Sequence, residues 1–234
     1  MSTEQSGFSP SSKARLTSHD LPRFAGDTLF DRIGRAVCEA GCLPRKELYE
    51  AWETARRVRR LFRGGRVMDL AGGHGLLAHI MLLLDDTSSL AVVIDTTIPS
   101  SADKLHASLV SAWPRLERRI KFRAVSIDDV ALEPTDVVVS AHACGTLTDQ
   151  IIDRATFVRA RVAVLPCCHD LRASDTGDLT GWIDGPLAVD IMRVQRMRAH
   201  GYQVWTQTIP SEITPKNRLL IGAPRSAGTA RDDE

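Results

Sequence analysis

The sequence has little of several features that would assign it to a specialised class of protein. Aromatic residues make up 5% of its 234 residues, so it offers few rings on which the bases of single-stranded RNA would stack. Its net charge is +1, which argues against binding nucleic acid through overall positive charge, although a local basic patch remains compatible. With 43% hydrophobic and 25% charged residues, the composition is that of an ordinary globular protein.

The chain also lacks the marks of a secreted or membrane protein. The aliphatic run at residues 80–84 is far shorter than the roughly 20 residues that span a bilayer. Residues 1–20 are polar and lack the apolar centre of a signal peptide. The odd number of cysteines argues against a disulfide framework. These are Cys38, Cys42, Cys144, Cys167 and Cys168. We therefore expect a cytoplasmic protein without a membrane segment.

Hydrophobic periodicity divides the chain into four parts. Residues 1–20 and 225–234 are polar without periodicity and are expected to be disordered tails. Residues 21–63 have helical spacing and are expected to form a helical extension. Residues 64–224 alternate between short apolar segments and helical segments, as in an α/β domain.

This alternation predicts a mostly parallel sheet with helices on both faces. The last two strands have no helix between them and should therefore pair antiparallel. The expected fold is α/β and Rossmann-like: a seven-stranded, mostly parallel sheet with an antiparallel C-terminal strand, plus N-terminal helices. The expected strands are 66–70, 90–94, 120–125, 136–141, 161–165, 202–209 and 218–222.

A glycine-rich turn follows the first predicted strand, in the segment Val67–Leu77. Glycines let the backbone turn sharply and approach a ligand closely, and the helix that follows offers free N–H groups. Ligands of open α/β sheets bind at the carboxyl ends of such strands. Asp69, at the strand end, is placed to accept a hydrogen bond from an ammonium group.

Residues 73–78 also fit the Gly-x-Gly-x-x-Gly/Ala pattern of dinucleotide-binding proteins, with Asp95 about 20 residues further on. Two features disfavour a nicotinamide cofactor. Asp69 precedes the glycines, where an ammonium is expected rather than a pyrophosphate. The two last predicted strands also complete the sheet, and no second substrate domain is expected after them.

The first motif resembles that of the class I S-adenosylmethionine (SAM)-dependent methyltransferases over residues 63–224. Asp69, Gly73 and Gly75 match, while Ala71 stands where the family usually has its first glycine. The resemblance implies that Asp95 holds the ribose hydroxyls of SAM and Asp128 meets the adenine amine. The cofactor-binding residues expected on this basis are Asp69, Ala71, Gly72, Gly73, Gly75, Asp95 and Asp128.

Two further segments follow the fourth and fifth predicted strands. The first, residues 140–149, contains His142 and Cys144, and the second, residues 165–170, contains Cys167, Cys168 and His169. The pair is similar to the His-x-Cys-Gly-x-x-Thr-Asp and Cys-Cys-His segments of the methyltransferase branch that includes tRNA acceptor-stem 2′-O-methyltransferases. The Cys/His-rich zinc elements that the eukaryotic tRNA enzymes carry outside the catalytic domain have no counterpart here.

Four interpretations of this cluster stay open from the sequence. A histidine acts as a general base, the residues pack around SAM, they bind a metal such as zinc, or a cysteine acts as a nucleophile. Our prediction assigns catalysis to His142, Cys144, Cys167 and His169 and assigns no metal.

The methyl acceptor is not defined by these motifs. The resemblance implies an RNA 2′-hydroxyl, and a small molecule or a protein is nearly as well supported. RNA contact is expected through Arg56, Arg57, Arg60 and Arg63, although these residues also fit an ordinary solvated helix face. A non-catalytic interaction subunit with the same fold is the alternative from another class.

Two smaller features complete the sequence-based predictions. Asp190 and Arg193 are three residues apart on a predicted helix, as in an ordinary surface ion pair. Residues 213–218 lie between the last two strands and are expected to form a turn, or to hold a substrate anion through Lys216 and Arg218.

Overall fold

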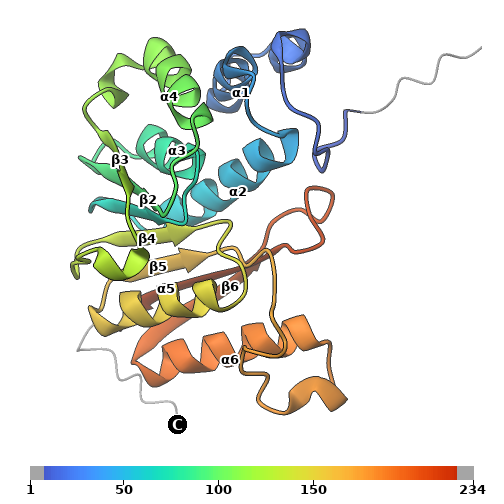
Figure 1. Cartoon of the computed structure of the whole chain (residues 1–234), viewed down its shortest axis with the longest axis vertical. Coiled ribbons are helices and arrows are strands. Elements are labelled where there is room, and N and C mark those ends of the chain that lie inside the picture. Colours follow the sequence, from blue (N-terminus) through green and yellow to red (C-terminus); the bar gives the residue numbers. More distant parts are fainter. Residues whose placement is uncertain (1–7, 226–234) are drawn as a thin grey trace, which may run out of the picture.

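A seven-stranded sheet with the order β3-β2-β1-β4-β5-β7-β6 forms the centre of the molecule (Figure 1). The computed structural model describes residues 8–225. Strand β7 is antiparallel to both of its neighbours, and the other six strands run in one direction. The strands are β1 (Val67–Leu70), β2 (Ala91–Asp95), β3 (Ile120–Ala124), β4 (Val137–Ser140), β5 (Arg161–Val164), β6 (Tyr202–Thr208) and β7 (Arg218–Pro224). The predicted α/β sheet with an antiparallel C-terminal strand is thus confirmed.

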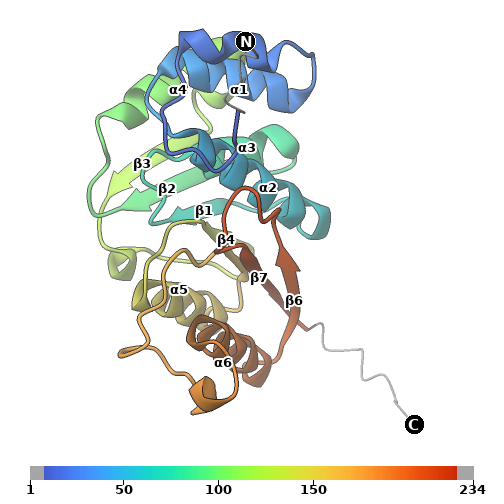
Figure 2. The ribbon, with the colours of Figure 1, turned by 90° about the vertical axis from the view of Figure 1, so that its right-hand side faces the viewer.

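Helices cover both faces of the sheet, as Figures 1 and 2 show. One face carries α1 (Leu29–Ala40), α2 (Arg45–Leu61), α3 (Leu76–Leu84) and α4 (Ser101–Ala112), and the other carries α5 (Thr146–Phe157) and α6 (Gly185–Ala199). Short 3-10 helices are η1 (Ser18–Phe24), η2 (Pro114–Leu116), η3 (Ile127–Asp129) and η4 (Leu179–Gly181). Within the described range, no helix is long and apolar enough to cross a bilayer.

The central strands β1, β2, β4 and β5 have no polar face because they are buried on both sides, whereas the edge strands β3 and β6 each expose several residues. In β2, Ala91 and Val93 belong to the core beneath α2 and α3, whereas Val92 and Ile94 belong to a second core beneath α5 and α6. Alternate side chains of a strand point to opposite faces, so a doubly covered strand is apolar throughout.

The N-terminal segment departs from the prediction of a disordered tail over residues 1–20. Residues 1–7 lie outside the described range, but residues 8–20 are packed against the helices. Leu16 is fully buried and its N–H donates to the carbonyl of Leu43 at 2.9 Å. The ring of Phe8 packs edge-on against Phe24 at 6.0 Å. The buried leucine, the aromatic contact and backbone hydrogen bonds to the start of α2 anchor this segment, and none of them produces a periodic pattern. Of the predicted tail 225–234, only Arg225 is described.

The direction of the strands decides where a ligand would bind. Strands β1, β2, β4 and β5 end at the same edge of the sheet, and the antiparallel β7 begins there. The loops after these strands therefore meet, and most of the sequence-predicted site residues lie in them.

Candidate functional site

A cavity of about 400 Å³ lies at this edge, bounded by the loops after β1, β2 and β4 and by α2. Its size falls in the usual range for small-molecule sites, roughly 300–1,000 Å³. Its lining residues are Glu47, Ala51, Asp69, Ala71, Gly72, Gly73, His74, Leu76, Leu77, Asp95, Ala141, His142, Cys144 and Leu147. Six of the seven predicted cofactor-binding residues line it or, like Gly75, belong to the loop that forms its floor.

The glycine loop has the close packing that the motif predicts. A Cβ on Gly72 would lie 2.8 Å from Asp69 Cγ and 2.8 Å from Val93 Cγ1, so a side chain there requires its neighbours to move. Gly75 has φ +73° and the same lack of space, with Val93 Cγ2 at 2.7 Å. Ala71 has φ +56°, a left-handed conformation that favours glycine. The departure from the family pattern at Ala71 is therefore a strained residue in an otherwise intact turn.

Asp95 ends β2 and lines the cavity. One of its carboxylate oxygens accepts a hydrogen bond from the Gly73 N–H at 3.1 Å, so the carboxylate is held against the glycine loop. A carboxylate at this strand end can accept hydrogen bonds from two neighbouring hydroxyls of a ligand.

Asp69 is buried beneath the loop, with 1% of its surface exposed. Its carboxylate accepts a hydrogen bond from the Ala78 N–H at 3.2 Å. Burial raises the pKa of Asp69 to about 7, the Ala78 N–H opposes this rise, and the charge of Asp95 adds to it. A cation in the cavity would favour the ionised form of Asp69.

Asp128, the seventh predicted cofactor-binding residue, is not among the residues that line the cavity. Its N–H donates to Ser126 Oγ at 3.2 Å in a tight turn that buries Ile127, and its side chain is 71% exposed. Its carboxylate lies 3.6 Å from Arg154 Nη1. The turn of η3 therefore directs the Asp128 side chain toward Arg154 on α5.

Two residues that the sequence analysis missed, His74 and Glu47, also line the cavity. His74 Nδ1 lies 4.0 Å from Glu47 Oε2. Burial lowers the pKa of His74, Glu47 counteracts this, and the nearby His142 lowers it further. The position of His74 between two motif glycines was the available signal, whereas Glu47 lies on a helix with no motif. His142 is exposed and lines the same cavity.

Three thiols converge beside this cavity. Cys144 follows β4, while Cys167 and Cys168 follow β5, and their sulfur atoms all lie within 4.8 Å of one another. Burial raises the pKa of Cys167. Burial also acts to raise the pKa of Cys168, but hydrogen bonds from the other two thiols and the Lys216 ammonium, 3.6 Å away, outweigh it and lower that pKa. The sequence-predicted cysteines are therefore brought together.

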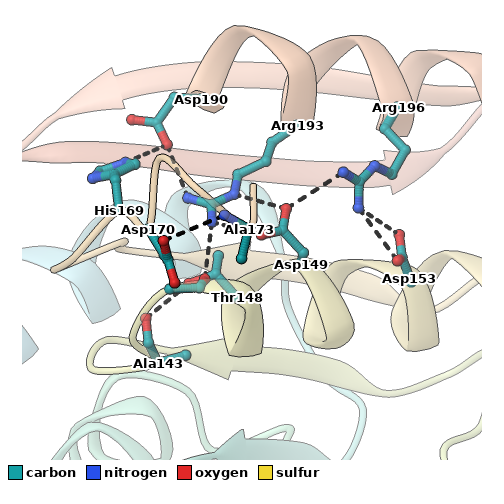
Figure 3. A network of polar contacts seen from close by, with 11 residues as sticks. Ala143, Thr148, Asp149, Asp153, His169, Asp170, Ala173, Asp190, Arg193 and Arg196 are labelled. Carbon is teal, nitrogen blue, oxygen red and sulfur yellow. Dashed lines mark hydrogen bonds and ion pairs between the residues drawn. The ribbon is translucent and has the colours of Figure 1, made fainter. Parts of the chain in front are cut away.

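His169 lies apart from the cofactor cavity, in a buried network of ions (Figure 3). Its side chain is 4% exposed and its Nε2 lies 2.9 Å from Asp190 Oδ1. Asp190 also accepts hydrogen bonds from Arg218 at 2.6 Å and from Arg193 at 3.2 Å. Burial acts to raise the pKa of Asp190, but the hydrogen bonds from His169 and Arg218 outweigh it and lower that pKa.

Arg193 joins this network to the motif after β4. It is fully buried and forms two hydrogen bonds with the carboxylate of Asp149, at 3.0 and 2.8 Å, and a third with the carbonyl of Gly145 at 3.1 Å. The interpretation of Asp190 and Arg193 as a surface pair is therefore wrong. Of the two cations proposed to hold a substrate anion, Arg218 is already engaged by Asp190.

The four arginines predicted to contact RNA, three on α2 and Arg63 just after it, differ in how far other contacts already engage them. Arg56 and Arg57 both form ion pairs with Glu53, and Arg63 donates to the carbonyl of Leu84. Arg60 is exposed and, with Arg57, lines a groove of about 840 Å³ between α2, β6 and α6. Arg198 and Arg218 complete the positive lining of this groove.

Comparisons with known proteins agree with this geometry. A family model described as a methyltransferase domain matches residues 47–174. A search of curated protein sequences finds no match. Among solved structures, an O-methyltransferase family protein from Burkholderia thailandensis superposes with a TM-score of 0.50 at 18% identity, over 91% of this chain and 64% of that one. A putative O-methyltransferase from Nostoc punctiforme gives a TM-score of 0.51 at 13% identity, over 88% of this chain and 66% of that one.

These two structures share the fold, and the chain spans less than two thirds of the length of either one. The family model is more informative, because the matched region contains the glycine loop, Asp95 and both cysteine segments. The match extends over more than half of the sequence. The chain therefore belongs to this methyltransferase-domain family.

Proposed function

We propose that the cavity at the β1–β2–β4 edge binds SAM and that the chain transfers its methyl group to a ribose 2′-hydroxyl of RNA. The observation that carries the cofactor assignment is the cradle formed by Gly72 and Gly75, where a side chain would collide with Val93, together with the carboxylate of Asp95. SAM supplies an activated methyl group, so the protein has to bind SAM and the acceptor, orient the acceptor oxygen toward the methyl group and remove the hydroxyl proton.

Within this proposal, Asp95 accepts hydrogen bonds from the ribose hydroxyls, and the glycine loop allows close approach of the amino-acid part. The buried carboxylate of Asp69 favours an ammonium group nearby. Asp128 is left out, because its side chain faces Arg154.

His142 is the better candidate for the general base. It is exposed and lines the cofactor cavity, whereas His169 is buried with Nε2 directed at Asp190. A base has to reach the hydroxyl proton of the acceptor, and imidazole has an ordinary pKa close to neutrality. His169 is instead a positioning residue that acts through the ion network.

The RNA acceptor is supported by the resemblance of the His-x-Cys-Gly and Cys-Cys-His segments and by the groove that Arg57, Arg60 and Arg198 line. Arginines contact phosphates through paired N–H groups. The similar solved structures support the fold alone, and the proposal of a hydroxyl acceptor does not rest on the activities of those proteins.

Calorimetric titration with SAM, S-adenosylhomocysteine and NAD tests the cofactor. We expect both adenosyl ligands to bind and NAD not to bind. Asp95→Ala should weaken SAM binding by roughly 10- to 100-fold, as expected for loss of hydrogen bonds to a charged group. Asp128→Ala is the matched control and should bind SAM normally. No adenosyl binding by the wild-type chain would refute the proposal.

Transfer of labelled methyl groups to RNA tests the acceptor. Alkali-resistant dinucleotides identify 2′-O-methylation. His142→Gln should lower kcat by about 100-fold or more, the usual loss for a general base, with little change in SAM affinity. SAM binding without any labelled RNA would reject the RNA acceptor and leave the cofactor assignment in place.

A further inference from the structure

Three cysteine side chains from two loops meet at the wall of the cofactor cavity. Cys144 comes from the loop after β4, and Cys167 and Cys168 come from the loop after β5. The sulfur atoms of Cys144 and Cys167 lie 3.1 Å apart, and all three sulfurs lie within 4.8 Å of one another. None of the three is in a disulfide.

The backbone holds the two loops in this arrangement. Cys144 and Cys168 form a parallel β-bridge beyond the ends of their strands, and the Gly145 N–H donates to the Cys168 carbonyl at 3.2 Å. The cysteines are therefore positioned by main-chain contacts that continue the β4–β5 pairing. A preformed group of ligands loses less conformational entropy on binding an ion than a flexible one.

The spacing suits a thiophilic metal ion. Zinc–sulfur bonds are about 2.3 Å long, which places two thiolates of a tetrahedral site roughly 3.8 Å apart. The observed sulfur separations, from 3.1 Å to at most 4.8 Å, bracket this value, so side-chain shifts of less than about 1 Å would suffice. A disulfide would use two of the thiols and leave the third beside it without a partner.

We infer that Cys144, Cys167 and Cys168 form a binding site for Zn²⁺ at the boundary between the cofactor cavity and the adjacent groove. Three thiolates and one Zn²⁺ carry a net charge of −1, and the Lys216 ammonium, 3.6 Å from Cys168 Sγ, compensates it. The sequence alone assigned no metal to these residues.

An ion at this position would lie next to two hollows, the cofactor cavity and a neighbouring groove. Cys144 lines the cofactor cavity and also a second, more open groove together with Cys168, His169 and Arg172. Zinc with three protein ligands keeps a fourth position for a water or a substrate atom. Metal binding as such does not depend on the proposed RNA methylation and is measured without SAM.

The test uses the untagged full chain, reduced and freed of metal. Co²⁺ is added first as a spectroscopic probe, since thiolate ligands give it a charge-transfer band and tetrahedral coordination gives it intense visible bands. Zn²⁺ is then added in competition with a chromophoric chelator. We expect one ion per chain, and replacement of bound Co²⁺ by Zn²⁺.

Variants identify the ligands. Cys144→Ser, Cys167→Ser and Cys168→Ser should each weaken Zn²⁺ binding by at least about 100-fold, the upper end of the loss seen when a merely supporting residue is removed. Cys42→Ser is the matched control, because Cys42 is half-buried and its thiol contacts the Ser101 carbonyl instead of the cluster. Absence of binding in the wild-type chain, or equal affinity in the cluster and control variants, overturns the inference.

A measurement on the unchanged chain covers the case in which a variant fails to fold. Zn²⁺ should slow alkylation of Cys144, Cys167 and Cys168, read residue by residue by mass spectrometry, and leave Cys42 unaffected. Equal alkylation rates with and without Zn²⁺ would overturn the inference. So would a Cys144–Cys167 disulfide that persists in the presence of reductant.

Discussion

Two halves of the same sheet edge are built in different ways. The cofactor half, formed by the loops after β1 and β2, is made mainly of backbone: a glycine turn with two carboxylates, Asp69 buried beneath it and Asp95 held against it. The acceptor half, formed by the loops after β4 and β5 with α6 and the start of β7, is made of side chains. There, Arg193 and Asp190 are buried and join four separate segments of the chain. Both names follow the proposed function. The cofactor half depends on local conformation, and the acceptor half depends on the tertiary structure.

Removing the centre of the ion network should have the largest effect. Arg193→Met removes the two-bond partner of Asp149 and one of the three partners of the buried Asp190, and should lower the free energy of unfolding by about 3–5 kcal/mol. Arg196→Met is the comparison, because Arg196 lies at the edge of the network, where its pairs with Asp153 and, at 3.5 Å, with Asp149 are partly exposed and should contribute at most about 1 kcal/mol. Denaturant unfolding measures both. Equal losses would show that the acceptor half does not depend on its buried ions.

The two halves should also respond to pH in opposite directions. The pKa of Asp69 is raised to about 7, so the folded chain keeps a proton that the unfolded chain has already lost above pH 4. Stability should therefore fall by a few kcal/mol as the pH rises from about 4 to 7. The pKa of Asp190 is lowered, so its contribution is complete above pH 4 and is lost as the pH falls below that value.

Urea unfolding over this pH range separates the two contributions. Asp69→Asn should remove the decline between pH 4 and 7, and Asp190→Asn should flatten the loss below pH 4. The shape of each profile is the result to compare, since Asp190→Asn also changes stability at every pH. Identical profiles for the two variants would contradict the assignment.

Within the cofactor half, alanine substitutions at two adjacent glycines should differ in their cost to stability. Gly72→Ala places a Cβ 2.8 Å from Asp69 Cγ and should cost about 1–3 kcal/mol, as overpacking does, with weaker SAM binding. At Gly73 nothing lies within 4 Å of the added Cβ, and the φ of +49° should cost only about 1 kcal/mol. Thermal unfolding and SAM calorimetry check both variants. A larger loss in Gly73→Ala would mean that conformation outweighs contact in this loop.

The smallest effect expected is a gain in stability. Ala71→Gly relieves the left-handed conformation at φ +56°, worth roughly 1–2 kcal/mol for a non-glycine residue, and loses part of this to the entropy of glycine. A rise in unfolding free energy of at most about 1 kcal/mol should result. A lower melting temperature in this variant would argue against strain at Ala71.

The same contrast explains what the sequence could and could not predict. The strands and the glycine turn are encoded in contiguous residues, so the fold was predicted correctly and Asp69 and Asp95 were placed at the cavity. Asp190 and Arg193 have the spacing of any surface ion pair, and only the position of β7 beside β5 shows that they are buried. Asp128 lies on a short 3-10 turn, which periodicity does not predict, and its carboxylate faces Arg154 there. The catalytic roles of His142 and the cysteines stay predictions.

Because β7 runs against its neighbours, it brings its first residue, Arg218, to the edge where the parallel strands end. It also lies between β5 and β6, although it follows both along the chain. During synthesis, the edge of β5 that pairs with β7 therefore stays unpaired until β7, the last of the described strands, has been made. The glycine turn can form as soon as β1 and β2 have left the ribosome, whereas Asp190 can meet Arg218 only after β7 has emerged. A nascent chain would thus have its cofactor half before it has a complete acceptor half.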